Sequence, residues 1–271
     1  MTKALVLGGS GLVGSAVINE MNKYNYFEVY STYFKNPILL DTVRNFKLDI
    51  EDLVNINTIL NDIKPNIVVS SLRGDFNKQL IAHEKIAKFL KATGGSLYFF
   101  STTNVFDNDY SRPHYEEDLP NAQSEYGQYK LECEKKILDI LGDNACILRI
   151  PQVWSKNSPR MKELLHSLNY NKKIIVYPKL FLNTNTDVMI ARQLCYIINN
   201  DLKGIFHLAS EEEVNYKNFY LELISRLGFK NVTVEDDFEV EGYFTLLSKR
   251  NNNFPEQLRF TYKSVIDYLT L

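Results

Sequence analysis

A tyrosine and a lysine that stand four residues apart, Tyr126 and Lys130, could carry out acid–base chemistry. On a helix, positions i and i+4 share a face, so the Lys130 ammonium can lie near the Tyr126 phenol. A free phenol has a pKa of about 10, and a nearby cation lowers that pKa toward neutrality. Earlier in the chain, Thr102 follows an apolar segment, and its hydroxyl could bind the same substrate oxygen that Tyr126 protonates. The three residues therefore predict a general acid–base site that acts on an oxygen atom.

A glycine-rich turn near the N-terminus forms the second chemical signal. An apolar run at residues 4–7 is followed by Gly8-Gly9-Ser10-Gly11-Leu12-Val13-Gly14 and then by a helix-like segment at residues 15–21. A strand, a glycine turn and a helix in that order indicate dinucleotide binding, because the backbone can approach a pyrophosphate and the helix N-terminus offers free N–H groups. The predicted cofactor contacts of this turn are Gly8, Ser10, Gly11, Leu12, Val13 and Gly14.

Two registers of the glycine motif remain open, since the turn fits both Gly9-x-Gly11-x-x-Gly14 and Gly8-x-x-Gly11-x-x-Gly14. Two other glycine motifs are excluded. A P-loop would need Gly-Lys-Ser/Thr after the turn, and a nucleophile elbow would need a glycine where Leu12 stands.

The end of the predicted second strand bears on the choice between NAD and NADP. An Asp or Glu at this place binds the ribose 2′-hydroxyl and favours NAD. The strand ends in Ser31-Thr32-Tyr33-Phe34-Lys35, without an acidic residue. We therefore predict that Thr32 and Lys35 contact the cofactor and that Lys35 pairs with the 2′-phosphate of NADP, with NAD as the alternative.

The elements that must position these residues alternate between strand and helix. Strands are predicted at residues 4–7, 28–33, 45–49, 67–70, 96–100 and 145–149, and further helices at 51–62, 76–92 and 124–141. This alternation predicts an α/β protein with a Rossmann-type, doubly wound parallel sheet that helices cover on both faces.

After Pro151 the alternation weakens, with helices predicted at 159–169, 187–199 and 215–227 and short strands at 173–176 and 204–208. We predict a NAD(P)-binding Rossmann domain at residues 1–150. Residues 151–271 are predicted to form mainly a smaller C-terminal substrate-binding lobe, with some elements (about 185–208) returning to the Rossmann domain. The lobe is expected over the carboxyl edge of the sheet, where ligands of open α/β sheets bind.

Composition excludes several classes of function. The 271 residues are 45% hydrophobic and carry a net charge of −2, so no general attraction to nucleic acid or to a membrane surface is expected. Three widely spaced cysteines form no metal-binding pattern, and no metal is expected. The chain starts directly with a strand and has no long apolar segment, so we expect a cytoplasmic protein without a signal peptide.

Several stretches together resemble the extended short-chain dehydrogenase/reductase superfamily, and within it the dTDP-4-dehydrorhamnose reductase branch of sugar-nucleotide-binding proteins. The likeness covers most of residues 1–228 and is carried by residues 8–14, 48–50, 101–102, 105–107, 116–120, 126–130 and 204–209. It implies that Thr102, Tyr126 and Lys130 form the catalytic set. It also implies that the cofactor is flanked at its adenine by Asp49 and Ile50 and lined by Ser70, Ser71 and Leu72.

The same resemblance implies that the segments after the fifth and sixth strands face a sugar. The predicted substrate-binding residues are Thr103, Asn104, Val105, Gln152 and Trp154. The chain departs from the family here: Thr103-Asn104 replaces the usual Asp-Tyr, and the segment after the sixth strand has Gln152 close to the place where the rhamnose-pathway enzymes would have a tryptophan. These departures leave the identity of the sugar open.

The expected function is the NAD(P)H-dependent reduction of a ketone on a nucleotide-linked sugar. A sugar-nucleotide epimerase or dehydratase is one alternative, although elimination needs an extra acid and base that Thr103 and Asn104 do not supply. A non-catalytic NADP-binding regulatory subunit is the other alternative. The family also suggests a homodimer formed through residues 76–92 and 124–141.

Overall fold

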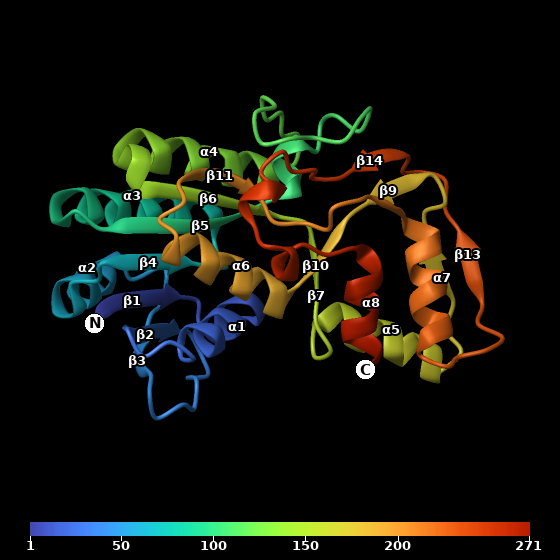
Figure 1. Cartoon of the computed structure of the whole chain (residues 1–271), viewed down its shortest axis with the longest axis horizontal. Helices are drawn as coiled ribbons and strands as arrows, with labels where there is room; N and C mark the ends of the chain where they lie inside the picture. Colours follow the sequence, from blue (N-terminus) through green and yellow to red (C-terminus); the bar gives the residue numbers. More distant parts are fainter.

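The computed structural model describes all 271 residues and contains a central sheet of seven parallel strands in the order β11-β6-β5-β4-β1-β2-β3 (Figure 1). This order confirms the predicted Rossmann-type fold. The strands are β1 (Thr2–Leu7), β2 (Phe27–Tyr33), β3 (Arg44–Lys47), β4 (Ile67–Ser70), β5 (Ser96–Thr102), β6 (Ala145–Ile150) and β11 (Gly204–His207).

Helices cover both faces of this sheet. One face packs against α1 (Leu12–Met21) and α6 (Asp187–Asn199). The other packs against α2 (Leu53–Ile63), α3 (Phe76–Thr93) and α4 (Glu125–Leu141). The seven strands and these five helices are called the sheet body below.

Continuous apolar sequence explains why the central strands are buried on both faces. In β1, Ala4 and Val6 belong to the cluster under α1 and α6, whereas Leu5 and Leu7 belong to the cluster under α2 to α4. Successive side chains of a strand point to opposite faces, so a strand covered on both sides needs apolar residues throughout.

A second body lies beside the carboxyl edge of the sheet, on the right in Figure 1. Its 18 buried apolar residues form a separate core that includes Trp154, Phe219 and Ile266. Its elements are β7 (Gln152–Trp154), α5 (Pro159–Asn169), β8 (Ile174–Val176), β9 (Leu180–Leu182), β10 (Thr184–Thr186), β12 (Val214–Asn215), α7 (Tyr216–Arg226), β13 (Val234–Asp236), β14 (Gly242–Phe244) and α8 (Tyr262–Thr270).

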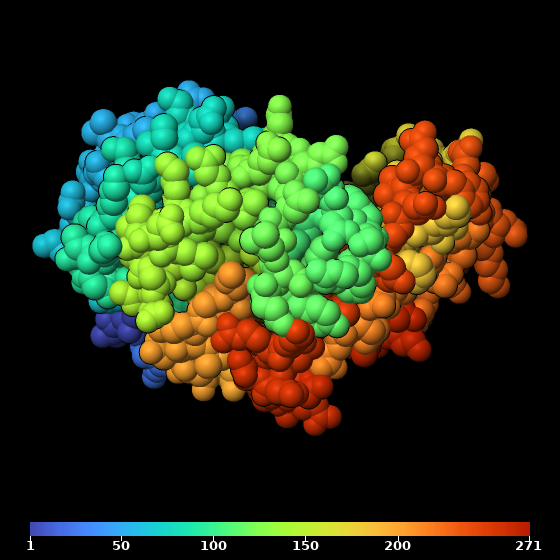
Figure 2. All heavy atoms as spheres, turned by 90° about the horizontal axis from the view of Figure 1, so that it is seen from above, coloured from blue at the N-terminus to red at the C-terminus, as the bar shows by residue number.

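Several short helical segments complete the chain: η1 (Thr103–Phe106), η2 (Gly142–Asn144), η3 (Asn251–Asn253) and η4 (Glu256–Leu258). Seen from above, the segment between β5 and α4 lies over the seam between the two bodies, and a hollow separates part of it from the second body (Figure 2). None of the helices combines the length and the apolar character that crossing a membrane would require.

The prediction contains no element between residues 229 and 271, whereas the structure has β13, β14 and α8 there. The two strands pair in parallel with β8 and β9, which lie far back in the sequence. Local sequence cannot predict such strands, because each is only three residues long and forms only when it pairs with a strand from another part of the chain.

Two histidines are enclosed in the sheet body. The Nε2 atom of His83 lies 2.7 Å from the Ser70 hydroxyl, and the Nδ1 atom of His207 lies 2.8 Å from the Leu247 carbonyl oxygen. Burial lowers the pKa of each imidazole to about 3, so both stay neutral in the folded protein at neutral pH.

The two histidines predict a loss of stability in mild acid. An unfolded histidine has a pKa of about 6.5, so below that pH the unfolded chain binds protons that the folded chain does not. We expect the free energy of unfolding to fall by about 1 kcal/mol per histidine for each pH unit below pH ~6. Urea titrations of the wild type and of His83→Asn should show a weaker pH dependence in the variant. Equal slopes would contradict the assignment.

Candidate functional site

The glycine turn after β1 is folded tightly against the neighbouring strands. Gly8 has a φ of 73°, and its amide donates to the Thr32 hydroxyl over 3.0 Å. A Cβ atom on Gly14 would lie 2.4 Å from the Gly8 carbonyl oxygen, and one on Gly9 would lie 2.1 Å from the Ser31 hydroxyl oxygen. The turn therefore needs Gly8, Gly9 and Gly14. Gly14 is common to both motif registers, whereas Gly8 and Gly9 belong to one register each.

The N-terminus of α1 has donors without acceptors. Gly11 caps the helix without a side-chain hydrogen bond. No carbonyl or side chain accepts from the amides of Leu12, Val13 or Gly14. Free amides at a helix N-terminus, beside a turn that excludes Cβ atoms, fit the pyrophosphate of a dinucleotide.

Three predicted cofactor residues use their hydroxyls inside the protein instead. The Thr32 hydroxyl accepts from Gly8, and the Ser71 hydroxyl donates to the Leu7 carbonyl oxygen over 2.9 Å. The Ser70 hydroxyl is buried against His83. A buried hydroxyl must find a hydrogen-bond partner, and these partners come from distant segments. Thr32 and Ser71 support the glycine turn, and the cofactor contacts of Thr32, Ser70 and Ser71 stay predictions.

The remaining predicted cofactor residues keep accessible side chains. Lys35 is exposed after β2, with its Nζ 5.8 Å from the centroid of the Phe34 ring. Asp49, Ile50 and Leu72 are partly exposed, and Ser10 is exposed. Their roles stay predictions.

Thr102 and Tyr126 meet at the carboxyl edge of the sheet. Thr102 is the last residue of β5, and Tyr126 lies in the first turn of α4 with 39% of its surface exposed. Burial raises the pKa of the Tyr126 phenol, while the adjacent Thr102 hydroxyl and the Arg73 guanidinium act in the opposite direction. The expected lowering of this pKa by Lys130 is therefore wrong for the protein alone.

Lys130 contacts the sheet and lies near the Tyr126 ring. Its ammonium is buried, donates to the Phe100 carbonyl oxygen over 2.8 Å, and lies 6.0 Å from the Tyr126 ring centroid. Burial lowers the pKa of Lys130 to about 8. A buried ammonium needs an acceptor, and β5 supplies a backbone carbonyl.

Arg73, which is absent from the predicted site residues, is the cation whose charge reaches both Tyr126 and Lys130. It lies in the exposed loop after β4. The sequence leaves open whether Arg73 contacts a cofactor or substrate phosphate or faces solvent, because its distance from α4 is set only when β4 and β5 pair.

Two contacts hold the β5 end and the α4 start together. The Asp107 carboxylate accepts from the amides of Gln123, over 2.6 Å, and Ser124, over 3.2 Å. Gly127 lies so close to η1 that a Cβ atom there would be 2.3 Å from the Asn104 carbonyl oxygen. This close packing brings Tyr126 beside Thr102.

The predicted substrate residues divide into accessible and buried ones. Asn104 and Gln152 are partly exposed, and the Gln152 Oε1 atom is buried without a hydrogen-bond partner. Val105 is fully buried with Phe106. Trp154 is fully buried in the second body.

Three of the predicted substrate residues, Thr103, Val105 and Trp154, have buried side chains. The Thr103 hydroxyl donates to the Ile150 carbonyl oxygen over 3.4 Å, while Val105 and Trp154 belong to apolar clusters. Their contacts with a substrate stay predictions.

A buried ion pair joins α4 to the sheet. Arg149 of β6 donates to Glu134 of α4 over 2.8 and 3.1 Å, and the Ser101 hydroxyl of β5 donates to the same carboxylate. Arg149 also lies 3.3 Å from His207 on β11. The helix that carries Tyr126 and Lys130 is therefore fixed to three strands.

With this geometry established, comparison with known proteins identifies the family. Residues 73–256 match the model of the RmlD substrate binding domain. The chain belongs to the RmlD substrate binding domain family. The resemblance to the dTDP-4-dehydrorhamnose reductase branch is thereby confirmed at the level of the family.

The curated relatives of this RmlD-family chain carry the names of two different functions, an enzyme subunit and a reductase. It is 28% identical to methionine adenosyltransferase 2 subunit beta from Bos taurus over 232 residues, which are 78% of this chain and 68% of that protein. It is 21% identical to dTDP-4-keto-6-deoxy-D-glucose reductase from Streptomyces niveus over 236 residues, which are 78% of this chain and 74% of that protein.

Solved structures share the whole fold. A dTDP-4-dehydrorhamnose reductase from Clostridium acetobutylicum matches with a TM-score of 0.83 and 20% identity, over 99% of this chain and 98% of that one. A dTDP-4-dehydrorhamnose reductase from Bacillus anthracis, solved in complex with NADP, matches with a TM-score of 0.81 and 16% identity over the same shares. At such identities the match concerns the fold.

The buried ion pair predicts a large effect of removing one charge. Replacing Glu134 by alanine leaves Arg149 buried without its carboxylate, so we expect the free energy of unfolding to fall by about 3–5 kcal/mol. Urea denaturation measures this loss. The control is Glu125→Ala on the exposed start of the same helix, for which a change within about 0.5 kcal/mol is expected. Equal effects of the two changes would contradict a structural role of the pair.

Proposed function

We propose that this RmlD-family protein is an NADPH-dependent oxidoreductase that reduces a ketone on a nucleotide-linked sugar, in the manner of a dTDP-4-dehydrorhamnose reductase. One observation carries the proposal. Thr102 at the end of β5 and Tyr126 in the first turn of α4 lie at the edge of the sheet where the unpaired amides of α1 also lie. A proton donor and a dinucleotide site at one sheet edge are what such a reduction needs.

The cofactor proposed is NADP, with NAD as the alternative. The amides of Leu12, Val13 and Gly14 would hold the pyrophosphate, and Lys35 would pair with the 2′-phosphate. When bound, NADPH supplies the hydride that reduces the carbonyl carbon. The NADP complex of the Bacillus anthracis reductase, which has the same fold, supports this choice.

The protein's own groups handle the proton and the orientation of the substrate. A phenol whose pKa is raised stays protonated at neutral pH, so Tyr126 can donate its proton to the carbonyl oxygen. The Thr102 hydroxyl would bind the same oxygen and orient it. Lys130, which already donates to Phe100, would use its remaining N–H groups to hold the cofactor ribose.

A dehydratase does not find its extra acid–base pair here. Thr103 is buried against Ile150, and Asn104 is an amide that donates to Asp107 over 3.3 Å. Elimination would need ionisable groups at these positions beside the sugar.

A regulatory subunit is the second candidate function, because the relative with 28% identity is named as subunit beta of another enzyme. In that case the glycine turn would bind NADP, and Thr102, Tyr126 and Lys130 would be retained without turnover.

We further propose that the second body, within residues 151–271, supplies most of the nucleotide-sugar contacts. Two copies are proposed to pair through α3 and α4, since α3 carries the exposed apolar residues Phe76 and Ile81. The proposed partners are thus a small-molecule substrate and a second copy of the chain.

Replacing Tyr126 by phenylalanine tests the proton donor. The change removes one oxygen, so we expect NADPH affinity to stay within about two-fold while reduction of a keto-sugar nucleotide slows by about 10²-fold or more. Absorbance of NADPH follows the turnover, and fluorescence titration follows the binding. Tyr170→Phe, at an exposed tyrosine of the second body, is the matched control.

The outcomes separate the candidate functions. Near-normal turnover in Tyr126→Phe would refute the role of the phenol. Tight NADPH binding by the wild type without turnover on any keto-sugar nucleotide, together with a co-purifying enzyme, would favour the regulatory subunit.

Replacing Lys35 by alanine tests the cofactor preference. Loss of one charge-assisted contact costs about 1.5 kcal/mol, so we expect the Kd for NADPH to rise about tenfold while the Kd for NADH stays unchanged. Lys91→Ala on the exposed end of α3 is the control. Wild-type binding of NADH as tight as that of NADPH would reverse the choice of cofactor.

A further inference from the structure

A buried glutamine, Gln79, joins two segments that border the candidate active site. It lies in the first part of α3, and only 2% of its surface is exposed. Its side-chain nitrogen donates to the Gly74 carbonyl oxygen over 2.8 Å, and its Oε1 atom accepts from the Tyr129 hydroxyl over 2.8 Å. One end of the amide is therefore bound to the loop after β4, and the other end is bound to α4.

The loop between β4 and α3, residues 71–75, is held at two places. Ser71 is bound to the glycine turn, because its hydroxyl donates to the Gly8 carbonyl oxygen over 3.2 Å. Gln79 holds the loop at Gly74, which has a φ of 137°. Apart from these bonds the loop is exposed or partly exposed, so fixing its backbone costs conformational entropy that the bonds must offset.

Arg73 lies in the middle of this loop, and its charge reaches both members of the acid–base pair, Tyr126 and Lys130. Burial raises the pKa of the phenol and lowers the pKa of the ammonium, and the Arg73 guanidinium lowers both. The size of such an effect depends on the distance between the groups. The place of the loop therefore matters to the pair.

Tyr129, the second partner of Gln79, lies among the same groups. Its ring stacks on Phe76, with the centroids 4.8 Å apart and the planes 5° from parallel. The Phe76 ring in turn lies 5.9 Å from the Tyr126 ring, and the Lys130 ammonium lies 5.6 Å from the centroid of Tyr129. The bond to Gln79 thus fixes a ring that neighbours the whole pair.

We propose that Gln79 is a positioning residue, which holds loop 71–75 against α4 and so keeps the Arg73 charge near the acid–base pair. The inference rests on the proposed reductase function, because only a working proton donor gives the position of Arg73 a consequence for turnover. Gln79 itself is buried and acts through its two partners rather than on a ligand.

Gln193 is a matched control, because it is a second buried glutamine that bridges two segments. It lies in α6 with 3% of its surface exposed. Its nitrogen donates to the Leu258 carbonyl oxygen over 3.0 Å, and its Oε1 atom accepts from Asn185 over 3.1 Å. Methionine in place of either glutamine keeps the length of the side chain and removes both bonds.

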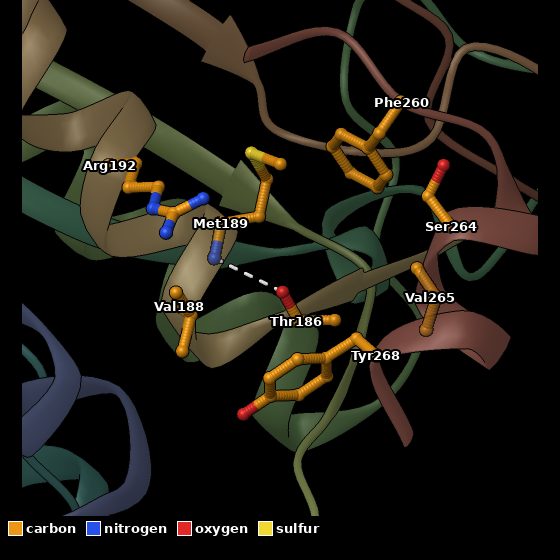
Figure 3. Close-up of a pocket in the computed structure, with 8 residues that line it drawn as sticks. All are labelled: Thr186, Val188, Met189, Arg192, Phe260, Ser264, Val265 and Tyr268. Atoms are coloured by element: carbon orange, nitrogen blue, oxygen red, sulfur yellow. Dashed lines mark hydrogen bonds between the residues drawn. The ribbon is translucent and has the colours of Figure 1, made fainter. Parts of the chain in front are cut away.

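The control helix packs on the face of the sheet opposite α3 and α4. Its start lines a cavity of about 220 Å³, which Val188 and Met189 border from α6 and Phe260 and Val265 border from the other side (Figure 3). None of the residues that line this cavity belongs to the candidate active site. A loss of turnover in Gln79→Met alone would therefore come from its place beside that site.

The first experiment compares Gln79→Met with Gln193→Met at a temperature where both are fully folded. Each variant loses two buried hydrogen bonds, so we expect both Tm values to fall by about 2–8 °C. Only Gln79→Met is expected to lower kcat for a keto-sugar nucleotide, by about tenfold. Its Kd for NADPH should change by less than about threefold, because Ser71 stays bound to the glycine turn. Equal effects of the two changes on kcat would overturn the proposal.

Tyr129→Phe separates positioning from stability. The single change leaves the bond to Gly74 in place, so kcat should fall less than in Gln79→Met. Combining Tyr129→Phe with Gln79→Met removes both polar partners, so the Tm should recover toward that of the wild type. We expect kcat of the combined variant to stay as low as in Gln79→Met, and a recovery of kcat together with the Tm would contradict positioning.

A double-mutant cycle tests the part played by Arg73. If Gln79 acts by placing this charge, adding Gln79→Met to Arg73→Met should lower kcat no further. A second tenfold loss in the Arg73→Met background would overturn the assignment to Arg73.

Trypsin cleavage after Arg73 tests the loop without any substrate. A protease needs the chain around the cleaved bond to open locally, and Gln79 holds the residue directly after that bond. Cleavage at this site should be at least about tenfold faster in Gln79→Met than in the wild type and unchanged in Gln193→Met. If the wild type reduces no keto-sugar nucleotide, the proposed function fails and this measurement still judges the loop. An unchanged rate in Gln79→Met would refute the positioning role itself.

Discussion

The buried ion pair between Glu134 and Arg149 constrains the rest of the candidate site. Neither charge can be left without its partner in the interior, so α4 has to keep one position against β5 and β6. That position sends the Lys130 ammonium to a carbonyl of β5 and places Tyr126 at the end of the same strand. Closer to the site, the small size of Gly127 lets α4 approach η1.

At the carboxyl edge of the sheet, backbone amides offer the phosphate site and side chains supply the acid–base groups. The free amides of α1 offer a site for phosphate that depends on the path of the main chain, and Thr32 and Ser71 maintain that path through hydrogen bonds to the glycine turn. The chemical groups, Thr102 and Tyr126, come from β5 and α4 instead. Cofactor binding and proton transfer can therefore be kept or lost separately, which is why a reductase and a cofactor-binding subunit are both compatible with one fold.

The sequence alone determined the sheet body, its glycine turn and the residues Thr102, Tyr126 and Lys130. The spacing of apolar residues and the glycines of a turn can be recognised within a short stretch of sequence. The predicted helix at residues 159–169 coincides with α5, and the one at 187–199 coincides with α6. Only the tertiary structure decided which side chains are free to meet a ligand. The Ser70 hydroxyl contacts His83, Trp154 packs in the core of the second body, and the Lys130 ammonium donates to the Phe100 carbonyl oxygen. The Ser70 hydroxyl and the Lys130 ammonium thereby gain partners from other segments, and the sequence carries no record of that pairing.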